Sequence, residues 1–125
     1  MKAILVAALA SVSAASRLYA ASYAGLVSTL SLAAGNASSG HLSVVSQSKA
    51  CGASPSWLTL DRHHDILYCL DEGVNGPNGS ITSFHTMPDG SLTPINHVET
   101  ITGPVMSVLY SASGLPGRQF MAVAH

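Results

Sequence analysis

The feature that most constrains this chain is a sequence repeat with a period near 50 residues. Leu18-Tyr19 recurs as Leu67-Tyr68 after 49 residues, and Phe120-Met121 follows 53 residues later. Three further pairs of segments agree with this spacing: residues 25–30 with 79–84, 40–45 with 90–95, and 56–60 with 105–109. A repeat of about 40–50 residues that contains four strands is typical of one β-propeller blade.

Short runs of β-forming residues alternate with turn residues, and no convincing helical periodicity follows residue 15. This pattern predicts an all-β fold. Strands are expected at residues 17–23, 26–32, 41–47, 56–60, 66–70, 80–85, 91–98, 105–110 and 119–123. They divide a partial β-propeller over residues 16–125 into a first blade (17–47), a second blade (56–98) and the start of a third (105–125).

About two four-stranded blades are too few for a closed ring, which has about 4–8. Each blade of a propeller buries its faces against its neighbours, so an isolated pair leaves sheet faces and strand edges open to water. We therefore expect the natural protein to be longer, and its remaining blades to be partners of this piece.

Residues 1–15 have the pattern of a secretory signal peptide. Lys2 supplies a positive charge, residues 3–10 form an apolar run, and Val12-Ser13-Ala14 places small residues before a cleavage site at Ala14 or Ala15. A membrane anchor and a buried helix are the alternatives, but an anchor needs about 20 apolar residues. We expect a secreted, extracellular protein with no membrane span after cleavage.

Export allows two modifications. Cys51 and Cys69 are expected either to form a disulfide or to leave Cys69 as a small buried hydrophobic residue. Asn36 and Asn78 each begin an Asn-X-Ser triplet, so both are candidate glycosylation sites. Neither the bridge nor the glycans can be decided from the sequence.

Charge and motifs exclude several functions. Five Lys and Arg against six Asp and Glu leave no basic patch for nucleic acid. The histidines share no metal-ligand spacing, and His63-His64 is expected to face solvent in a tight turn. No phosphate-binding loop, dinucleotide fingerprint or nucleophile elbow is present, so no cofactor and no metal are expected.

The motifs together resemble the seven-bladed lactonase family, which includes propeller-type 6-phosphogluconolactonase and carboxy-cis,cis-muconate cyclase. The resemblance rests on residues 53–61 and 66–72, then on Gly79-Ser80-Ile81-Thr82-Ser83-Phe84 and residues 89–93, and on the opening residues 18–23. It covers nearly all of residues 17–125. It implies a ring of seven blades, of which about two lie here.

The resemblance also implies a site at the mouth of the central channel. Glu72 falls on the family's channel-side glutamate, where a carboxylate can act as a general base. The alternative is a solvated loop acid. The family's "GP-C-H" turn reads Gly103-Pro104-Val105-Met106 here, so its histidine is absent. His125 is a second candidate catalytic residue, or else a partly buried, hydrogen-bonded histidine.

Two functions follow as expectations. The first is an exported lactone hydrolase or cycloisomerase, with this fragment inactive alone. The mature chain has few Arg or Lys residues to bind a phosphate group, so a non-phosphorylated lactone or carboxylated ring compound is the expected substrate. The second is a non-catalytic secreted propeller that binds glycans or protein partners, which the missing histidine favours.

Overall fold

The computed structural model describes residues 16–33 and 40–125, and it consists of nine strands. The expected signal peptide and the Asn36 site lie outside the described residues. The strands are β1 (Ser16–Ser22), β2 (Leu26–Ala33), β3 (His41–Ser48), β4 (Pro55–Asp61), β5 (Ile66–Asp71), β6 (Gly79–Thr86), β7 (Leu92–Thr100), β8 (Met106–Ser111) and β9 (Gln119–Ala124).

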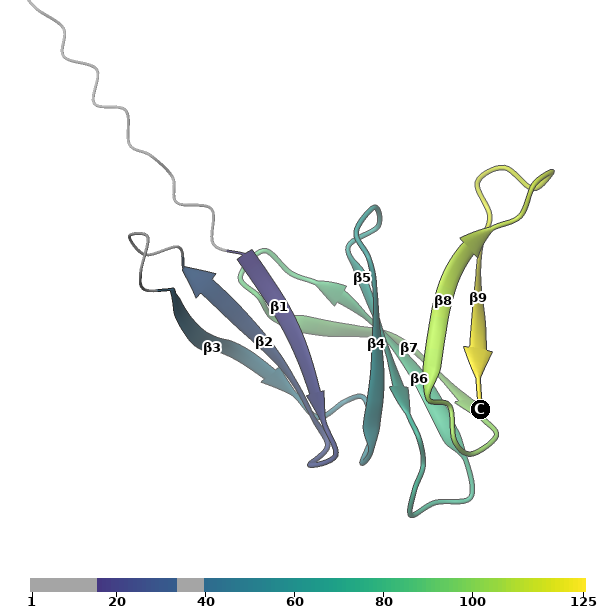
Figure 1. Cartoon of the computed structure of the whole chain (residues 1–125), viewed down its shortest axis with the longest axis horizontal. Coiled ribbons are helices and arrows are strands. Elements are labelled where there is room, and N and C mark those ends of the chain that lie inside the picture. Colours follow the sequence, from purple (N-terminus) through teal and green to yellow (C-terminus); the bar gives the residue numbers. More distant parts are fainter. Residues whose placement is uncertain (1–15, 34–39) are drawn as a thin grey trace, which may run out of the picture.

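The strands form three separate antiparallel sheets in chain order, which lie side by side (Figure 1). The first sheet has the order β1-β2-β3, the second β4-β5-β6-β7 and the third β8-β9. Over the described ranges the strands do not close into one barrel. Each strand pairs only with the strands next to it in the chain and within its own sheet. The prediction of an all-β propeller fragment is confirmed.

The hydrophobic core lies between the first and second sheets. The second sheet supplies Leu67, Cys69 and Phe84, and the first sheet supplies Val27, all 1% exposed or less. Tyr19 of β1 packs against this cluster. Neighbouring sheets thus bury one another's faces, as the repeat predicts.

The opposite face of the second sheet meets the third sheet. Thr59 Oγ1 lies 2.7 Å from Ser107 Oγ, and the Trp57 indole N–H donates to the Ser107 carbonyl at 3.2 Å. Alternation along β4 sends Trp57 and Thr59 to this face and Leu58 to the core with the first sheet. The second sheet therefore contacts a neighbouring sheet on each of its two faces.

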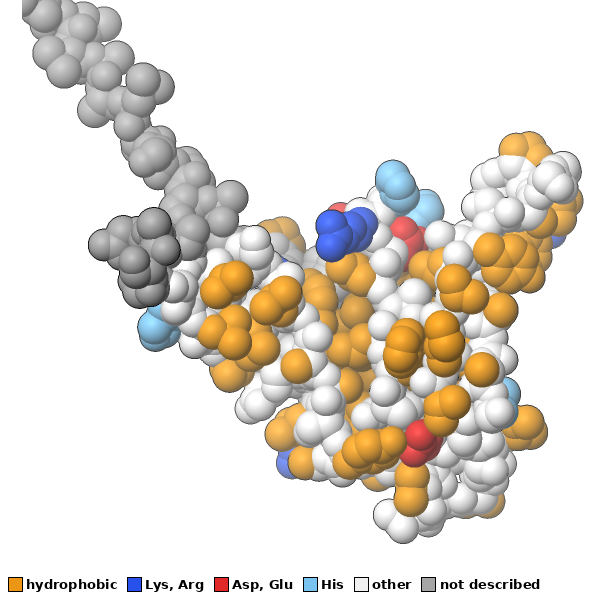
Figure 2. All heavy atoms as spheres, viewed as in Figure 1, with side chains coloured by type: hydrophobic (Ala, Val, Ile, Leu, Met, Phe, Trp, Pro, Cys, Tyr) orange, Lys and Arg blue, Asp and Glu red, His pale blue; other side chains and the backbone are white. Residues whose placement is uncertain are grey.

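The outer faces of the first and third sheets are open. Val44 of β3 is 60% exposed and Val108 of β8 is 53% exposed. Figure 2 shows hydrophobic side chains grouped over both regions. Groups of exposed apolar side chains of this kind are characteristic of a surface that another protein segment covers in the complete structure.

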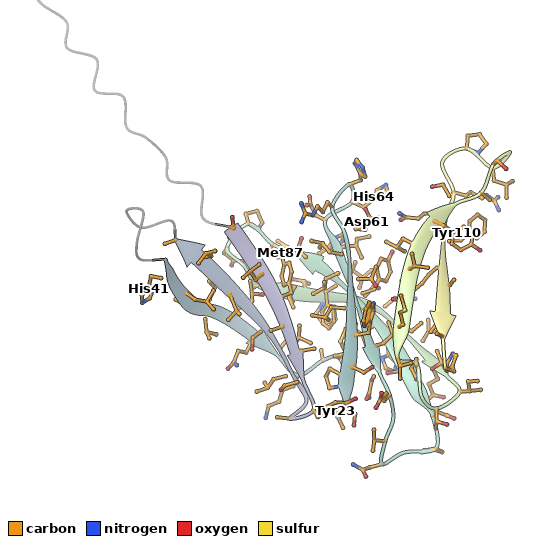
Figure 3. All side chains as sticks on the ribbon, in the orientation of Figure 1. Tyr23, His41, Asp61, His64, Met87 and Tyr110 are labelled. Atoms are coloured by element: carbon orange, nitrogen blue, oxygen red, sulfur yellow. A yellow bond between two sulfur atoms is a disulfide. The ribbon has the colours of Figure 1, made fainter. Side chains whose placement is uncertain are left out.

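The turn between β4 and β5 is organised by Asp61, whose side chain is buried. Its Oδ1 accepts the N–H groups of His63 and His64, and its Oδ2 lies 2.7 Å from His64 Nδ1 (Figure 3). Burial by itself would raise the pKa of Asp61, but these hydrogen bonds together lower it below its usual value.

The lowered pKa of Asp61 predicts how the free energy of unfolding depends on pH. Because the folded-state pKa of Asp61 lies below the unfolded value, its contribution is fully present above about pH 4 and is lost as the pH falls through the folded-state pKa. We expect Asp61→Asn to remove this part of the acid dependence, measured by urea unfolding between pH 2 and 6. Asp65→Asn in the same turn is the control, and identical acid limbs for wild type and Asp61→Asn would contradict the assignment.

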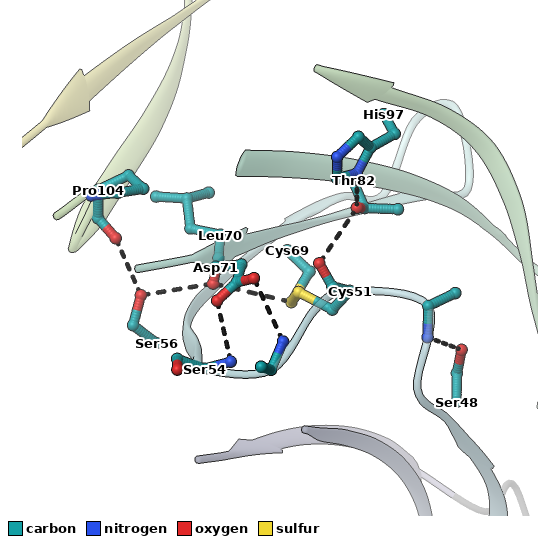
Figure 4. Close-up of a disulfide and its surroundings, with 12 residues drawn as sticks. Ser48, Cys51, Ser54, Ser56, Cys69, Leu70, Asp71, Thr82, His97 and Pro104 are labelled. Carbon is teal, nitrogen blue, oxygen red and sulfur yellow. Dashed lines mark hydrogen bonds between the residues drawn. A yellow bond between two sulfur atoms is a disulfide. The ribbon is translucent and has the colours of Figure 1, made fainter. Parts of the chain in front are cut away.

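A disulfide joins Cys51 to Cys69, with Cα atoms 5.9 Å apart (Figure 4). It ties the β3–β4 connection to β5 and is fully buried in the core cluster. Gly52 lies beside it at a φ of 138°, and a side chain there would overlap the Asp71 carboxylate. Of the two alternatives that the sequence left open, the structure contains the bridge.

Candidate functional site

Three residues with titratable side chains occupy equivalent places in the three sheets. Tyr23 directly follows β1, Glu72 directly follows β5, and His125 directly follows β9. They stand five residues after Leu18, Leu67 and Phe120, the landmarks of the repeat. We refer to Tyr23, Glu72 and His125 as the three-residue row. It lies at the end of the sheets where Figure 1 marks the C-terminus and Figure 3 labels Tyr23.

The backbone of Glu72 is held on both sides. Its N–H donates to the Ser54 carbonyl at 3.0 Å, and its carbonyl accepts the Gly103 N–H at 3.0 Å. These bonds connect Glu72 to the β3–β4 and β7–β8 connections. The position of the Glu72 Cα is thus determined by two loops from different parts of the chain.

The Glu72 side chain is hydrogen-bonded across sheets. The Tyr23 hydroxyl donates to Glu72 Oε2 at 3.0 Å, and this bond is the main reason that the pKa of Tyr23 is raised. Tyr23 is 63% exposed, so the pair is open to solvent. One carboxylate oxygen is thereby oriented, while Oε1 has no partner among the described residues and stays available to a water or a substrate.

Asp71, the neighbouring acid, has a structural role instead. Its Oδ1 accepts the N–H groups of Ser54 and Gly73, and its Oδ2 accepts that of Ala53. A carboxylate with this many backbone partners is committed to holding the loop. Of these two neighbouring acids, Glu72 is therefore the one whose carboxylate is not committed to backbone N–H groups.

His125 contacts the same β7–β8 connection as Glu72, but its side chain is not hydrogen-bonded to Glu72. Its Nδ1 lies 3.4 Å from the Thr102 carbonyl, and Thr102 precedes the Gly103 that donates to Glu72. The two candidate catalytic residues thus converge on residues 102–103. The structure records no hydrogen bond between their side chains within the residues it describes.

The position of the absent "GP-C-H" histidine is apolar. Pro104 is fully buried, next to Gly79, whereas Val105 is 43% and Met106 49% exposed. Residues 103–106 themselves therefore contribute no imidazole to this turn. Asn78 is exposed at the same end of the sheets, and its Nδ2 donates to Glu99 at 3.2 Å.

Within the described ranges, no three His, Cys, Asp or Glu side chains form a group that could hold a metal ion. His97 is hydrogen-bonded to Thr82 at 2.9 Å. Of the chain that the structure describes, no part is a helix long and apolar enough to cross a membrane.

Comparison with protein families decides the classification. Residues 14–125 match the family described as "Lactonase, 7-bladed beta-propeller". The chain belongs to the seven-bladed lactonase family. No curated protein and no solved structure matches the chain.

Membership of the lactonase family supports a lactonase-like function at the level of the family. The described residues supply one four-stranded sheet and parts of two others toward seven blades. The three-residue row gives this lactonase-family chain a carboxylate, a phenol and an imidazole on successive blades. Such groups can accept and donate protons at an ester carbonyl.

Tyr23 was not predicted from the sequence as a site residue, although the repeat spacing contains a signal for it. It stands 49 residues before Glu72, the offset of the Leu-Tyr landmark. Because neighbouring blades place equivalent positions side by side, the repeat itself indicates that these two residues meet.

Proposed function

We propose that this chain is part of an exported lactone-processing enzyme, a hydrolase or cycloisomerase, in which Glu72 is the general base. The observation that carries the proposal is the Tyr23–Glu72 hydrogen bond, which orients a solvent-accessible carboxylate at the end of a lactonase-family propeller. In hydrolysis, Glu72 takes a proton from water, and the water oxygen attacks the lactone carbonyl carbon. The ring C–O bond breaks, and the leaving alkoxide takes up the proton that Glu72 received, which gives the hydroxy acid and restores the carboxylate.

A non-phosphorylated substrate is favoured by where the cations lie. Arg17 in β1 hydrogen-bonds to the Met87 carbonyl, and Arg62 and Arg118 lie in the β4–β5 and β8–β9 connections. All three are at the opposite end of the sheets from Glu72. Among the described residues only Lys49, an exposed residue after β3, is a permanent cation at the Glu72 end. A phosphate group would be recognised by several such cations.

The proposed function also includes secretion of the protein and a requirement for further propeller blades. The pattern of residues 1–15 and the Cys51–Cys69 disulfide both support an oxidising, extracellular compartment. We propose that activity requires the closed ring, because Val44 and Val108 leave the outer sheet faces uncovered. This piece alone is then inactive.

The test is turnover of a lactone panel by the full-length protein and by Glu72→Gln. The panel holds sugar lactones with and without a phosphate group, and a carboxylated five-membered lactone. We expect Glu72→Gln to lower kcat by about 10²–10⁴-fold on the best substrate, the contribution of a general base. Glu99→Gln, which removes another carboxylate at the same end, should keep the activity.

A spectrophotometric titration accompanies the assay. Since the Glu72 hydrogen bond raises the pKa of Tyr23, Glu72→Gln should lower this pKa toward its ordinary value. This result shows that the pair is broken. Cooperative urea unfolding of the variant shows separately that it is folded, because an unfolded chain would also give an ordinary tyrosine pKa. Equal turnover by wild type and Glu72→Gln would remove Glu72 from the mechanism.

A second function, a non-catalytic secreted propeller that binds glycans or protein partners, is favoured by one observation. Exposed Val105 and Met106 stand where the family's histidine is expected. No turnover of any lactone by the full-length protein, together with binding on a glycan array, would select this function.

A further inference from the structure

A groove lined by residues with polar side chains and one glycine lies at the end of the sheets opposite to Glu72, between the β4–β5 turn and the β8–β9 connection. It encloses about 400 Å³ and is lined by His63, His64, Ser111, Gly117, Arg118 and Gln119. We call it the His63–Arg118 groove. Figure 3 labels His64 at the tip of this turn, and Figure 1 shows the β8–β9 connection at the same end of the sheets. A volume of this size suits a small ligand.

The groove offers hydrogen-bond donors and no carboxylate. Arg118 presents five N–H donors, Gln119 an amide, and Ser111 a hydroxyl. Asp61, the acid that hydrogen-bonds to this turn, is 4% exposed, and its oxygens already face the His63 N–H, the His64 N–H and His64 Nδ1. Its negative charge is therefore used inside the turn and not displayed to the groove.

The His64–Asp61 contact also orients an imidazole. With Nδ1 directed at Asp61 Oδ2 at 2.7 Å, the ring is fixed by its inner nitrogen, and Nε2 remains for a ligand. The His64 side chain is 64% exposed, so this nitrogen is accessible. Protonation makes Nε2 a donor and adds a positive charge beside Arg118.

The other charged and titratable groups around the two histidines are few. Arg62 and Asp65 stand on the same turn and face a separate hollow shared with Arg17. Tyr68 on β5 lies close enough to Asp61 for that charge to raise its pKa, after burial as the larger cause. His85 on β6 pairs with Ile66 at the end of the turn. None of these groups places a free carboxylate in the groove.

We propose that the His63–Arg118 groove binds a small oxyanion, such as a carboxylate, sulfate or phosphate group, and binds it more tightly when its histidines are protonated. The site is separate from the three-residue row and does not depend on lactone chemistry. Arg118 supplies a permanent charge and a planar pair of donors that matches an oxyanion. His63 and His64 add positive charge when their imidazoles are protonated.

The test is calorimetric titration of the full-length protein with sulfate, whose charge is the same at pH 5.5 and 7.5. We expect affinity at pH 5.5 to exceed that at pH 7.5 by at least 10-fold, and Arg118→Gln to abolish measurable binding. His63→Gln should weaken binding at pH 5.5 severalfold. This variant keeps the turn, because only the His63 backbone N–H bonds to Asp61.

His41→Gln is the matched control, since His41 is an exposed histidine at the start of β3. It should bind like wild type. Equal loss in His41→Gln and His63→Gln, or affinity that does not change with pH, would overturn the proposal. Parallel titrations with inorganic phosphate and succinate then assign the groove to phosphate-like or carboxylate ligands.

Discussion

Replacing Phe84 with alanine is expected to lower the free energy of unfolding by about 3–5 kcal/mol, the usual cost of removing a buried aromatic side chain from a packed core. Phe84 is 0% exposed and belongs to the cluster that holds the first sheet against the second. Its loss leaves a cavity at the contact between two sheets. We therefore expect it to loosen the first sheet as well as β6.

The matched control is Phe120→Ala, since Phe120 is partly exposed on β9 and stacks on Tyr110 with ring centroids 5.6 Å apart. The control should cost clearly less than Phe84→Ala in equilibrium urea unfolding. Hydrogen exchange of β1 and β2 amides provides the second measurement. Equal losses for the two variants, or unchanged exchange in the first sheet, would contradict a core shared between sheets.

Removing the disulfide with Cys51→Ala and Cys69→Ala together is the second large effect. The bridge closes a loop between positions 18 residues apart, which predicts a loss of about 3 kcal/mol through the entropy of the unfolded chain. Alanine avoids placing a hydroxyl in a site that is fully buried.

Urea unfolding of the double variant and of oxidised and reduced wild type measures this effect. Reduced wild type should resemble the double variant. Because both sulfurs are buried, we expect the native protein to resist mild reductants until it is partly unfolded. A double variant as stable as the oxidised protein would show that the bridge adds nothing to the fold.

The fold was largely predictable because repeat spacing and turn residues are local signals. The differences lie at strand ends: β4 begins at Pro55 and β7 extends to Thr100. Pro94 within β7 did not mislead the prediction, since β7 is the outermost strand of its sheet and tolerates a residue without an N–H. The register shift beside Phe84, which pairs with Pro94, is not visible in the sequence.

The candidate site was less predictable, because its contacts join separate sheets. Glu72 came from the family resemblance, whereas its hydrogen bond from Tyr23 depends on how two sheets pack. His63-His64 was expected simply to face solvent, yet His64 is held by Asp61. That contact requires a turn that ends with Asp65 at a positive φ of 54°, a detail that composition does not reveal.

The sharing of one core between the first two sheets has a consequence for how the protein acquires its structure. Val27 has its buried partners in Leu67, Cys69 and Phe84, so β1–β3 cannot complete a hydrophobic interior until β6 has been synthesised. A ribosome-bound chain that ends before residue 79 should therefore remain sensitive to proteases throughout. We therefore expect the smallest cooperative folding unit to span two sheets and to contain the disulfide.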